Sequence, residues 1–182
     1  MKPALVQKLN VAVFFATSFS CYQGARHGIP WLGLVILAVH VAFFLPSTTV
    51  KVRRILVALL TGLIGFIADS SMIRLGVYSV SASTRWLIPD PLCPEWILVL
   101  WLNFGFMLYV FWPVLAKSRL SAAVIGVIFA ILIMGNASRM DLILFRAPSW
   151  HGYLIVAACW AVLVPFFAFY SYRCFGENHV RS

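Results

Sequence analysis

The stretch from Arg54 to Leu75, RILVALLTGLIGFIADSSMIRL, is long enough to cross a bilayer, yet it carries an aspartate and an arginine within its span. A carboxylate at the centre of a spanning helix costs about 2.5–3.5 kcal/mol on insertion scales, so Asp69 is expected to face a bundle interior, a cavity or a partner charge. Gly62, Gly65 and Asp69 share one helix face, because they lie at positions i, i+3 and i+7. The sequence therefore predicts a smooth strip for close helix packing, with the acid at its end.

The composition indicates a protein that crosses a membrane several times. Hydrophobic residues make up 63% of the 182 positions and charged residues only 10%, and the apolar residues fall into long runs between short polar stretches. This pattern predicts an all-α polytopic protein with a single transmembrane domain over residues 1–182. Basic loops beside anionic lipid head groups account for the net charge of +9, so we expect membrane lipids as partners and no nucleic acid.

Six apolar runs are predicted to form the bundle. They are Leu5–Tyr22, Trp31–Leu45, the stretch quoted above, Pro94–Leu115, Leu120–Asn136 and Tyr153–Tyr172. The longest polar connection, Gly76–Cys93, is rich in serine and is predicted to be a surface loop with a short interfacial helix.

The distribution of basic residues favours both termini in the cytoplasm of a bacterial inner membrane. With the N-terminus inside, nine basic residues fall on the inner side and five on the outer side, and cytoplasmic loops carry the excess of Lys and Arg. The inner set is Lys2, Lys8, Lys51, Arg53, Arg54, Lys117, Arg119, Arg173 and Arg181, and the outer set is Arg26, Arg74, Arg85, Arg139 and Arg146.

In this orientation the polar residues collect near the outer ends of the helices, while the inner halves of the same spans are almost wholly apolar. We expect one polar site there, between the third, fourth and fifth spans and open to the outer leaflet. Arg74 lies about 140° around the helix from Asp69, so Asp69 is predicted to pair with Arg139 or Asn136 instead. Such pairing has a second interpretation, in which it only holds the bundle together.

The candidate residues divide into two groups. Asp69, Glu95 and His27 are candidate acids or bases, and Arg139, Asn136, Asn103 and His40 are candidate substrate-binding residues. Asn103 lies about 12 Å deeper than Glu95 on the same span and would form the floor of the site. His40 lies on the packing face of its helix, where a histidine is either a hydrogen-bonded core residue or part of the site.

The sequence supports no metal or cofactor site of known spacing. It has no i, i+4 histidine pair, no phosphate-binding loop and no Gly-x-Ser-x-Gly motif. The four cysteines share no Cys-x-x-Cys spacing, and two interpretations stay open for Cys21 and Cys93: a disulfide at the outer face, or small apolar residues in the core.

Short motifs spread over nearly the whole chain resemble a bacterial inner-membrane family catalogued as domain of unknown function 2878. The motifs are the run Gly24 to Gly33 (GARHGIPWLG), Gly65 through Asp69 to Gly76, Pro94-x-Trp96 with Leu100-Trp101 and Phe104, and Trp160 with Pro165. Members of that family often carry a histidine in the fourth span, where this chain has Asn103 to Tyr109 without one.

The resemblance implies lipid chemistry, because such genes are often found beside genes for fatty-acid-modifying enzymes. A second likeness is to small membrane cyclases of carotenoid synthesis, whose Pro-x-Glu-Glu element is matched here only by Pro94-Glu95-Trp96, without the second acid. Three functional classes stay open: a lipid-modifying or lipid-handling protein, a non-catalytic subunit of a larger membrane complex, and a small-solute permease.

Overall fold

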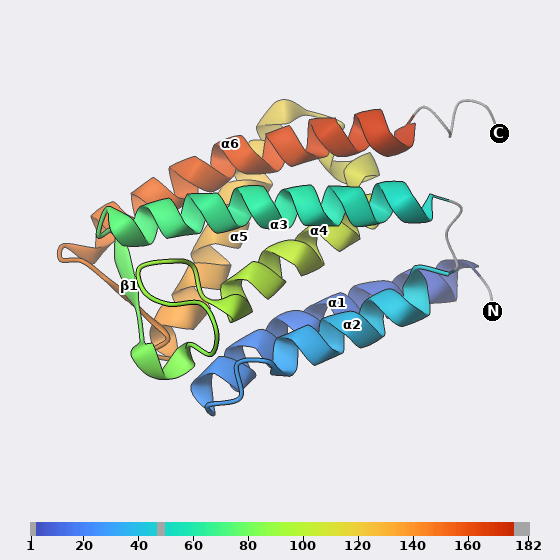
Figure 1. The fold of residues 1–182 in the computed structure, drawn as a ribbon. Coiled ribbons are helices and arrows are strands. Elements are labelled where there is room, and N and C mark those ends of the chain that lie inside the picture. Colours follow the sequence, from blue (N-terminus) through green and yellow to red (C-terminus); the bar gives the residue numbers. More distant parts are fainter. Residues whose placement is uncertain (1–2, 47–49, 177–182) are drawn as a thin grey trace.

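The described chain folds into six α-helices. The computed structural model describes residues 3–46 and 50–176. The helices are α1 (Pro3–Arg26), α2 (Leu32–Phe44), α3 (Lys51–Arg74), α4 (Glu95–Leu115), α5 (Arg119–Arg139) and α6 (Ser149–Phe175), as Figure 1 shows. The predicted all-α class is confirmed. α1 begins and α6 ends at the same end of the bundle (Figure 1).

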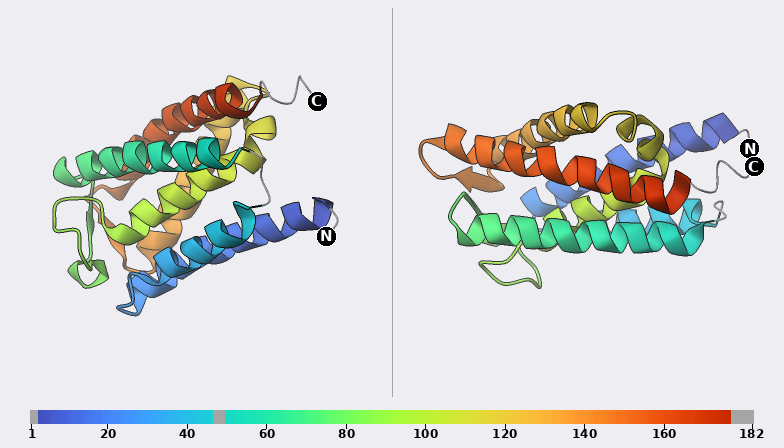
Figure 2. Two further views of the ribbon diagram at one scale, coloured as in Figure 1. Left: turned by 45° about the vertical axis from the view of Figure 1, so that its right-hand side comes forward. Right: turned by 90° about the horizontal axis from the view of Figure 1, so that it is seen from above.

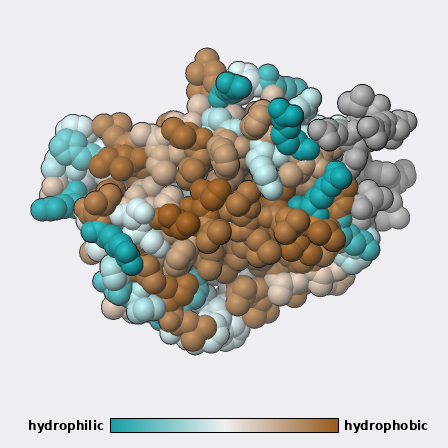
Figure 3. Space-filling model, turned by 45° about the horizontal axis from the view of Figure 1, so that its top comes forward, coloured by the Kyte–Doolittle hydropathy of each residue, from teal (hydrophilic) through white to brown (hydrophobic). Residues whose placement is uncertain are grey.

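Four of the described helices, α3 to α6, are long and apolar enough to cross a membrane. Figure 3 shows a broad apolar surface between polar ends. Leucines of α3 such as Leu59 and Leu63 are exposed as well. The protein is therefore embedded in a membrane. α2 is apolar but has only 13 residues, which gives about 20 Å of helix against about 30 Å of hydrocarbon. α1 has the length, with 24 residues, but is less apolar and is not among the four.

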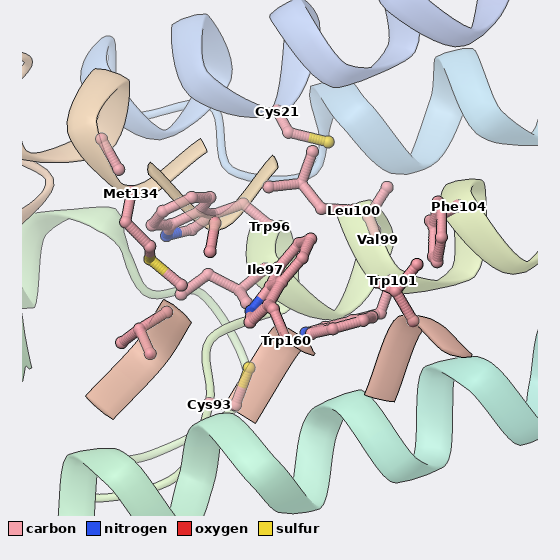
Figure 4. Packing of buried hydrophobic residues seen from close by; sticks show 14 of the residues in the cluster. Cys21, Cys93, Trp96, Ile97, Val99, Leu100, Trp101, Phe104, Met134 and Trp160 are labelled. Atoms are coloured by element: carbon pink, nitrogen blue, oxygen red, sulfur yellow. The ribbon is translucent and has the colours of Figure 1, made fainter. Parts of the chain in front are cut away.

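Helix α4 forms the centre of the bundle. It packs against α1, α2, α3 and α6, and it lies between the α1–α2 pair and α3 in Figures 1 and 2. α5 packs mainly on α6. Trp96 and Trp101 of α4 and Trp160 of α6 are buried together in the core shown in Figure 4, with the Trp101 and Trp160 ring centroids 4.5 Å apart. Bulky aromatic side chains thus fill the interior around α4.

The predicted smooth strip on α3 is confirmed. A side chain at Gly65 would overlap the Trp101 ring, and one at Gly62 would overlap Leu102. On α4, a side chain at Gly105 would likewise overlap Ala58 and Thr61 of α3. The two helices approach closely because small residues line their contact, as in other membrane bundles.

A short antiparallel hairpin closes one end of the bundle, called here the hairpin end. Strand β1 (Tyr78–Val80) follows α3 and pairs with β2 (Ile143–Phe145), which follows α5, in the register Tyr78 to Phe145. Gly76 and Asp141 end the two helices with positive φ angles of 70° and 59°, which turn the chain into the strands. The sequence analysis did not predict this pairing. The predicted short helix in the loop is the 3₁₀ turn η1 (Ala82–Thr84).

The predicted alternative of a disulfide between Cys21 and Cys93 is wrong. Both thiols are free and buried, and Figure 4 places them on opposite sides of the tryptophan cluster. Cys21 packs against Gly33 of α2. Burial, followed by the charge of Asp69, raises the pKa of the Cys93 thiol well above its usual value, so the reactive thiolate is disfavoured.

The close contact at Gly65 gives a first prediction. Gly65→Ala should lower the free energy of unfolding by about 1–3 kcal/mol, because the new methyl group overlaps the Trp101 ring. Gly135→Ala on α5 is the matched control, since a Cβ there meets nothing and alanine favours helix. The apparent melting temperature in detergent measures both variants. Equal melting temperatures would show that the α3–α4 contact is looser than described.

Candidate functional site

Asp69 is fully buried, with 0% of its surface exposed. Its Oδ1 accepts a hydrogen bond of 2.5 Å from the Tyr78 hydroxyl, and its Oδ2 accepts one of 2.5 Å from the Trp101 indole Nε1. The predicted burial is confirmed, but the predicted partners, Arg139 and Asn136, are wrong. Two neutral donors satisfy the carboxylate in place of a cation.

The hairpin and the glycine strip put these two donors in place. β1 carries Tyr78 back over the end of α3, and the space at Gly65 lets the Trp101 ring lie against α3 one turn before Asp69. Burial, and after it the neighbouring carboxylate, raises the pKa of Tyr78 well above its usual value near 10, so the hydroxyl keeps its proton and donates. The sequence analysis missed both donors because it sought a charged partner.

Glu95 holds the loop before α4 instead of facing Asp69. Its carboxylate accepts hydrogen bonds from the backbone N–H groups of Trp86, Leu87 and Ile88. Three amides aimed at one carboxylate, at the positive N-terminus of α4, fix both loop and helix start. Glu95, which was expected to lie in one polar site with Asp69, is thus hydrogen-bonded to the loop and not to Asp69.

A groove lies between α1, α4, α5 and α6, not between α3, α4 and α5 as predicted. Its volume is about 570 Å³. Apolar and aromatic side chains make up nearly all of its lining, which consists of Phe14, Phe15, Ser18, Phe19, Tyr22, Leu100, Trp101, Phe104, Phe129, Leu132, Ile133, Asn136, Met140 and Trp160. Trp101 thus contacts Asp69 with its indole nitrogen and lines the groove with its ring.

The predicted site residues separate around this groove. Asn136 lines it, and Arg139 follows one turn later on α5 with an exposed side chain. His27 is exposed just beyond the end of α1. Asp69, Glu95 and His27 are not among the residues that line this groove.

His40 and Asn103 belong to a second buried network, which joins α1, α2 and α4. His40 Nε2 lies 2.6 Å from Asn10 Oδ1, and its Nδ1 lies 3.3 Å from Asn103 Oδ1. Asn103 Nδ2 donates to the Phe14 carbonyl at 3.0 Å and to Ser18 Oγ at 3.1 Å. The core interpretation of His40 agrees with this geometry. Asn10 was not among the predicted site residues.

Arg54 is buried at the start of α3, away from the hairpin end. From the sequence it was counted among the basic residues of the inner side. Its Nε donates to the Phe106 carbonyl at 3.0 Å and its Nη1 to the Phe44 carbonyl at 3.3 Å, and the guanidinium lies 3.6 Å from the Phe106 ring centroid. Phe44 is the last residue of α2, and its carbonyl is one of those that the helix itself leaves without a backbone donor. Arg54 therefore supplies a donor and a positive charge at the negative end of that helix.

Comparison with known proteins confirms the family resemblance. A family model described as "Protein of unknown function (DUF2878)" matches residues 7–166. The chain belongs to the DUF2878 family. None of the curated proteins and none of the solved structures matches it. Within the described part of this DUF2878 protein, no group of three or more His, Cys, Asp or Glu residues is placed to hold a metal ion.

The two donors to Asp69 give a second prediction for this DUF2878 protein. Asp69→Asn should lower the free energy of unfolding by about 1–3 kcal/mol, because the amide oxygen can accept from Trp101 but the amide nitrogen cannot accept from Tyr78, whose buried hydroxyl loses its acceptor. Asp69→Leu should cost about twice as much, since both buried donors then lose their acceptor. Melting temperatures in detergent distinguish the two. A leucine variant as stable as the parent protein would contradict the structural role of Asp69.

Proposed function

We propose that this DUF2878 protein is a multi-pass inner-membrane protein that binds the acyl chain of a membrane lipid in the groove between α1 and α5. One observation carries the proposal: the groove is lined almost entirely by apolar and aromatic side chains. Its volume of about 570 Å³ lies within the range of about 300–1,000 Å³ that is usual for ligand pockets.

The polar groups near the groove would select the head group. A hydrocarbon chain gains little by leaving the bilayer for an equally apolar groove, so discrimination must come from polar contacts. Tyr22 and Asn136 supply these within the lining, and Arg26 and Arg139 follow one helical turn later on α1 and α5. Two cations at this position favour a lipid with an anionic head group.

The groove supports binding more directly than catalysis. Its described lining contains no aspartate, glutamate, histidine or cysteine, and both oxygens of Asp69 already accept hydrogen bonds. A general acid or base must reach the reacting group, and none of the candidates does so from within the groove. The runner-up function is a non-catalytic subunit, in which a helix of a partner protein would fill the same groove.

The proposed arrangement in the membrane has six crossings and both termini in the cytoplasm. α1 begins and α6 ends at the same end of the bundle, which supports an even number of crossings. The excess of basic residues supports the inner side of the membrane for that end. The hairpin end and the mouth of the groove would then face the outer leaflet.

A reporter experiment tests this orientation. A phosphatase that is active only outside the cytoplasm should give signal when fused at Ser83, in η1 at the hairpin end, because that end is proposed to be external. The same reporter at Ser118, between α4 and α5, should be silent. Activity at Ser118 with none at Ser83 would reverse the proposed orientation.

A pair of tryptophan variants tests lipid binding. Leu132→Trp should fill the groove and reduce co-purified lipid at least fivefold, as measured by native mass spectrometry of protein released from nanodiscs. Leu59→Trp on α3 is the matched control, because Leu59 is 56% exposed and Leu132 is 55% exposed, but only Leu132 lines the groove. Equal lipid in both variants contradicts the proposal. Parent protein that carries a second polypeptide and no lipid would favour the subunit function.

A further inference from the structure

The histidine on α2 is held by hydrogen-bonding groups on both ring nitrogens. His40 has no exposed surface, and each nitrogen faces a carboxamide: Asn103 of α4 at Nδ1 and Asn10 of α1 at Nε2. Its ring also packs edge-on with the rings of Phe44 and Phe106, at centroid distances of 5.3 and 5.1 Å. The imidazole is therefore fixed in position, while its protonation depends on the two amides.

The amide of Asn103 has only one orientation that satisfies its neighbours. Its Nδ2 donates to the Phe14 carbonyl and to Ser18 Oγ, and a flipped amide would direct an oxygen at the carbonyl oxygen of Phe14. Asn103 Oδ1 consequently faces His40, and His40 Nδ1 must carry a hydrogen to donate to it. This hydrogen is present in both the neutral and the charged imidazole.

Among residues 3–46 and 50–176, the Asn10 side chain has no hydrogen bond besides that to His40, so the other nitrogen can exist in two states. With Asn10 Oδ1 toward the ring, as the structure places it, His40 Nε2 donates and the imidazole is a cation. After a half-turn of the Asn10 amide, its Nδ2 donates to a bare Nε2 and the imidazole is neutral. Both protonation states then keep a full set of hydrogen bonds. From this geometry we propose that His40 is a proton-binding site and that the Asn10 amide turns when the proton binds or leaves.

The charged side chain near His40 comes from α3. On α3, the guanidinium of Arg54 contacts the same Phe106 ring as His40 and opposes a second positive charge. α1 and α4 present the neutral amides of Asn10 and Asn103 to the ring, and α2 presents Phe44. No acidic side chain hydrogen-bonds to His40 anywhere in residues 3–46 and 50–176. Two amide oxygens thus favour the proton, whereas burial of the ring and the nearby arginine disfavour it.

The proton site shares a wall with the lipid groove. Ser18 and Phe14 line the groove, and both accept a hydrogen bond from the Asn103 amide that also binds His40. Protonation strengthens the bond from His40 to Asn103, which shifts the amide against that wall. This regulatory consequence rests on the proposed function, whereas the proton site itself does not.

Histidine ¹⁵N resonances of the full chain in nanodiscs test the proton site between pH 4 and 8. His40 should titrate, with its resonance assigned by His40→Gln. Asn10→Asp should move the midpoint up by at least one pH unit, because a carboxylate favours the cation, and Asn10→Leu should move it down, because the acceptor is lost. The proposal is overturned if the His40 resonance does not titrate, or if its midpoint is the same in the parent protein and in both Asn10 variants.

The coupling has a separate test, the binding of a spin-labelled phosphatidic acid as a function of pH. Affinity should change at least threefold across the His40 midpoint in the parent protein and stay constant in His40→Gln. Binding that is equally pH-dependent in both proteins overturns the coupling. Absence of binding at every pH overturns the proposed function, and with it the coupling, while the ¹⁵N titration still decides the proton site.

Discussion

The hydrogen bond from the Trp101 indole to Asp69 is the interaction on which the rest of the bundle depends. A buried carboxylate in a membrane helix must be satisfied from within the protein, and Trp101 reaches it only because Gly65 leaves room for the ring. The second donor, Tyr78, requires β1 to return over α3, which requires β2 to hold β1 in register. One acidic side chain thus connects a helix contact with a hairpin. The same tryptophan ring lines the groove, so the acid determines part of the groove's shape.

The two buried polar networks divide the interior between them. Asp69 and its donors lie toward the hairpin end, while His40 and its two amides come from α1, α2 and α4. Neutral donors and acceptors surround Asp69 in one network and His40 in the other. This arrangement lets the helices bury both ionisable side chains without an ion pair between them. Lipid binding and proton binding are therefore proposed for adjacent but chemically distinct sites.

The sequence predicted those features that depend on local patterns. Hydropathy located the helices, and the spacing of Gly62, Gly65 and Asp69 predicted the close α3–α4 contact and the burial of the acid. The partners of Asp69 could not be predicted in this way, because one is a neutral indole on another helix and the other depends on a strand pairing far along the chain. The groove was missed for a similar reason. Its walls come from α1 and α5, and their separation depends on how α1 packs on α4 and how α5 packs on α6, not on either sequence alone.

Exchange of the Trp101 indole proton with deuterated water tests whether this proton is hydrogen-bonded to Asp69. In nanodiscs, the ¹H–¹⁵N resonance of Trp101, assigned with Trp101→Phe, should exchange with deuterated water far more slowly than that of Trp150, which is 57% exposed. The same resonance should shift in Asp69→Asn, because its acceptor changes from a carboxylate to an amide, and should shift again when a lipid enters the groove. A Trp101 proton that exchanges as fast as that of Trp150, and whose resonance ignores the residue at position 69, would contradict the account.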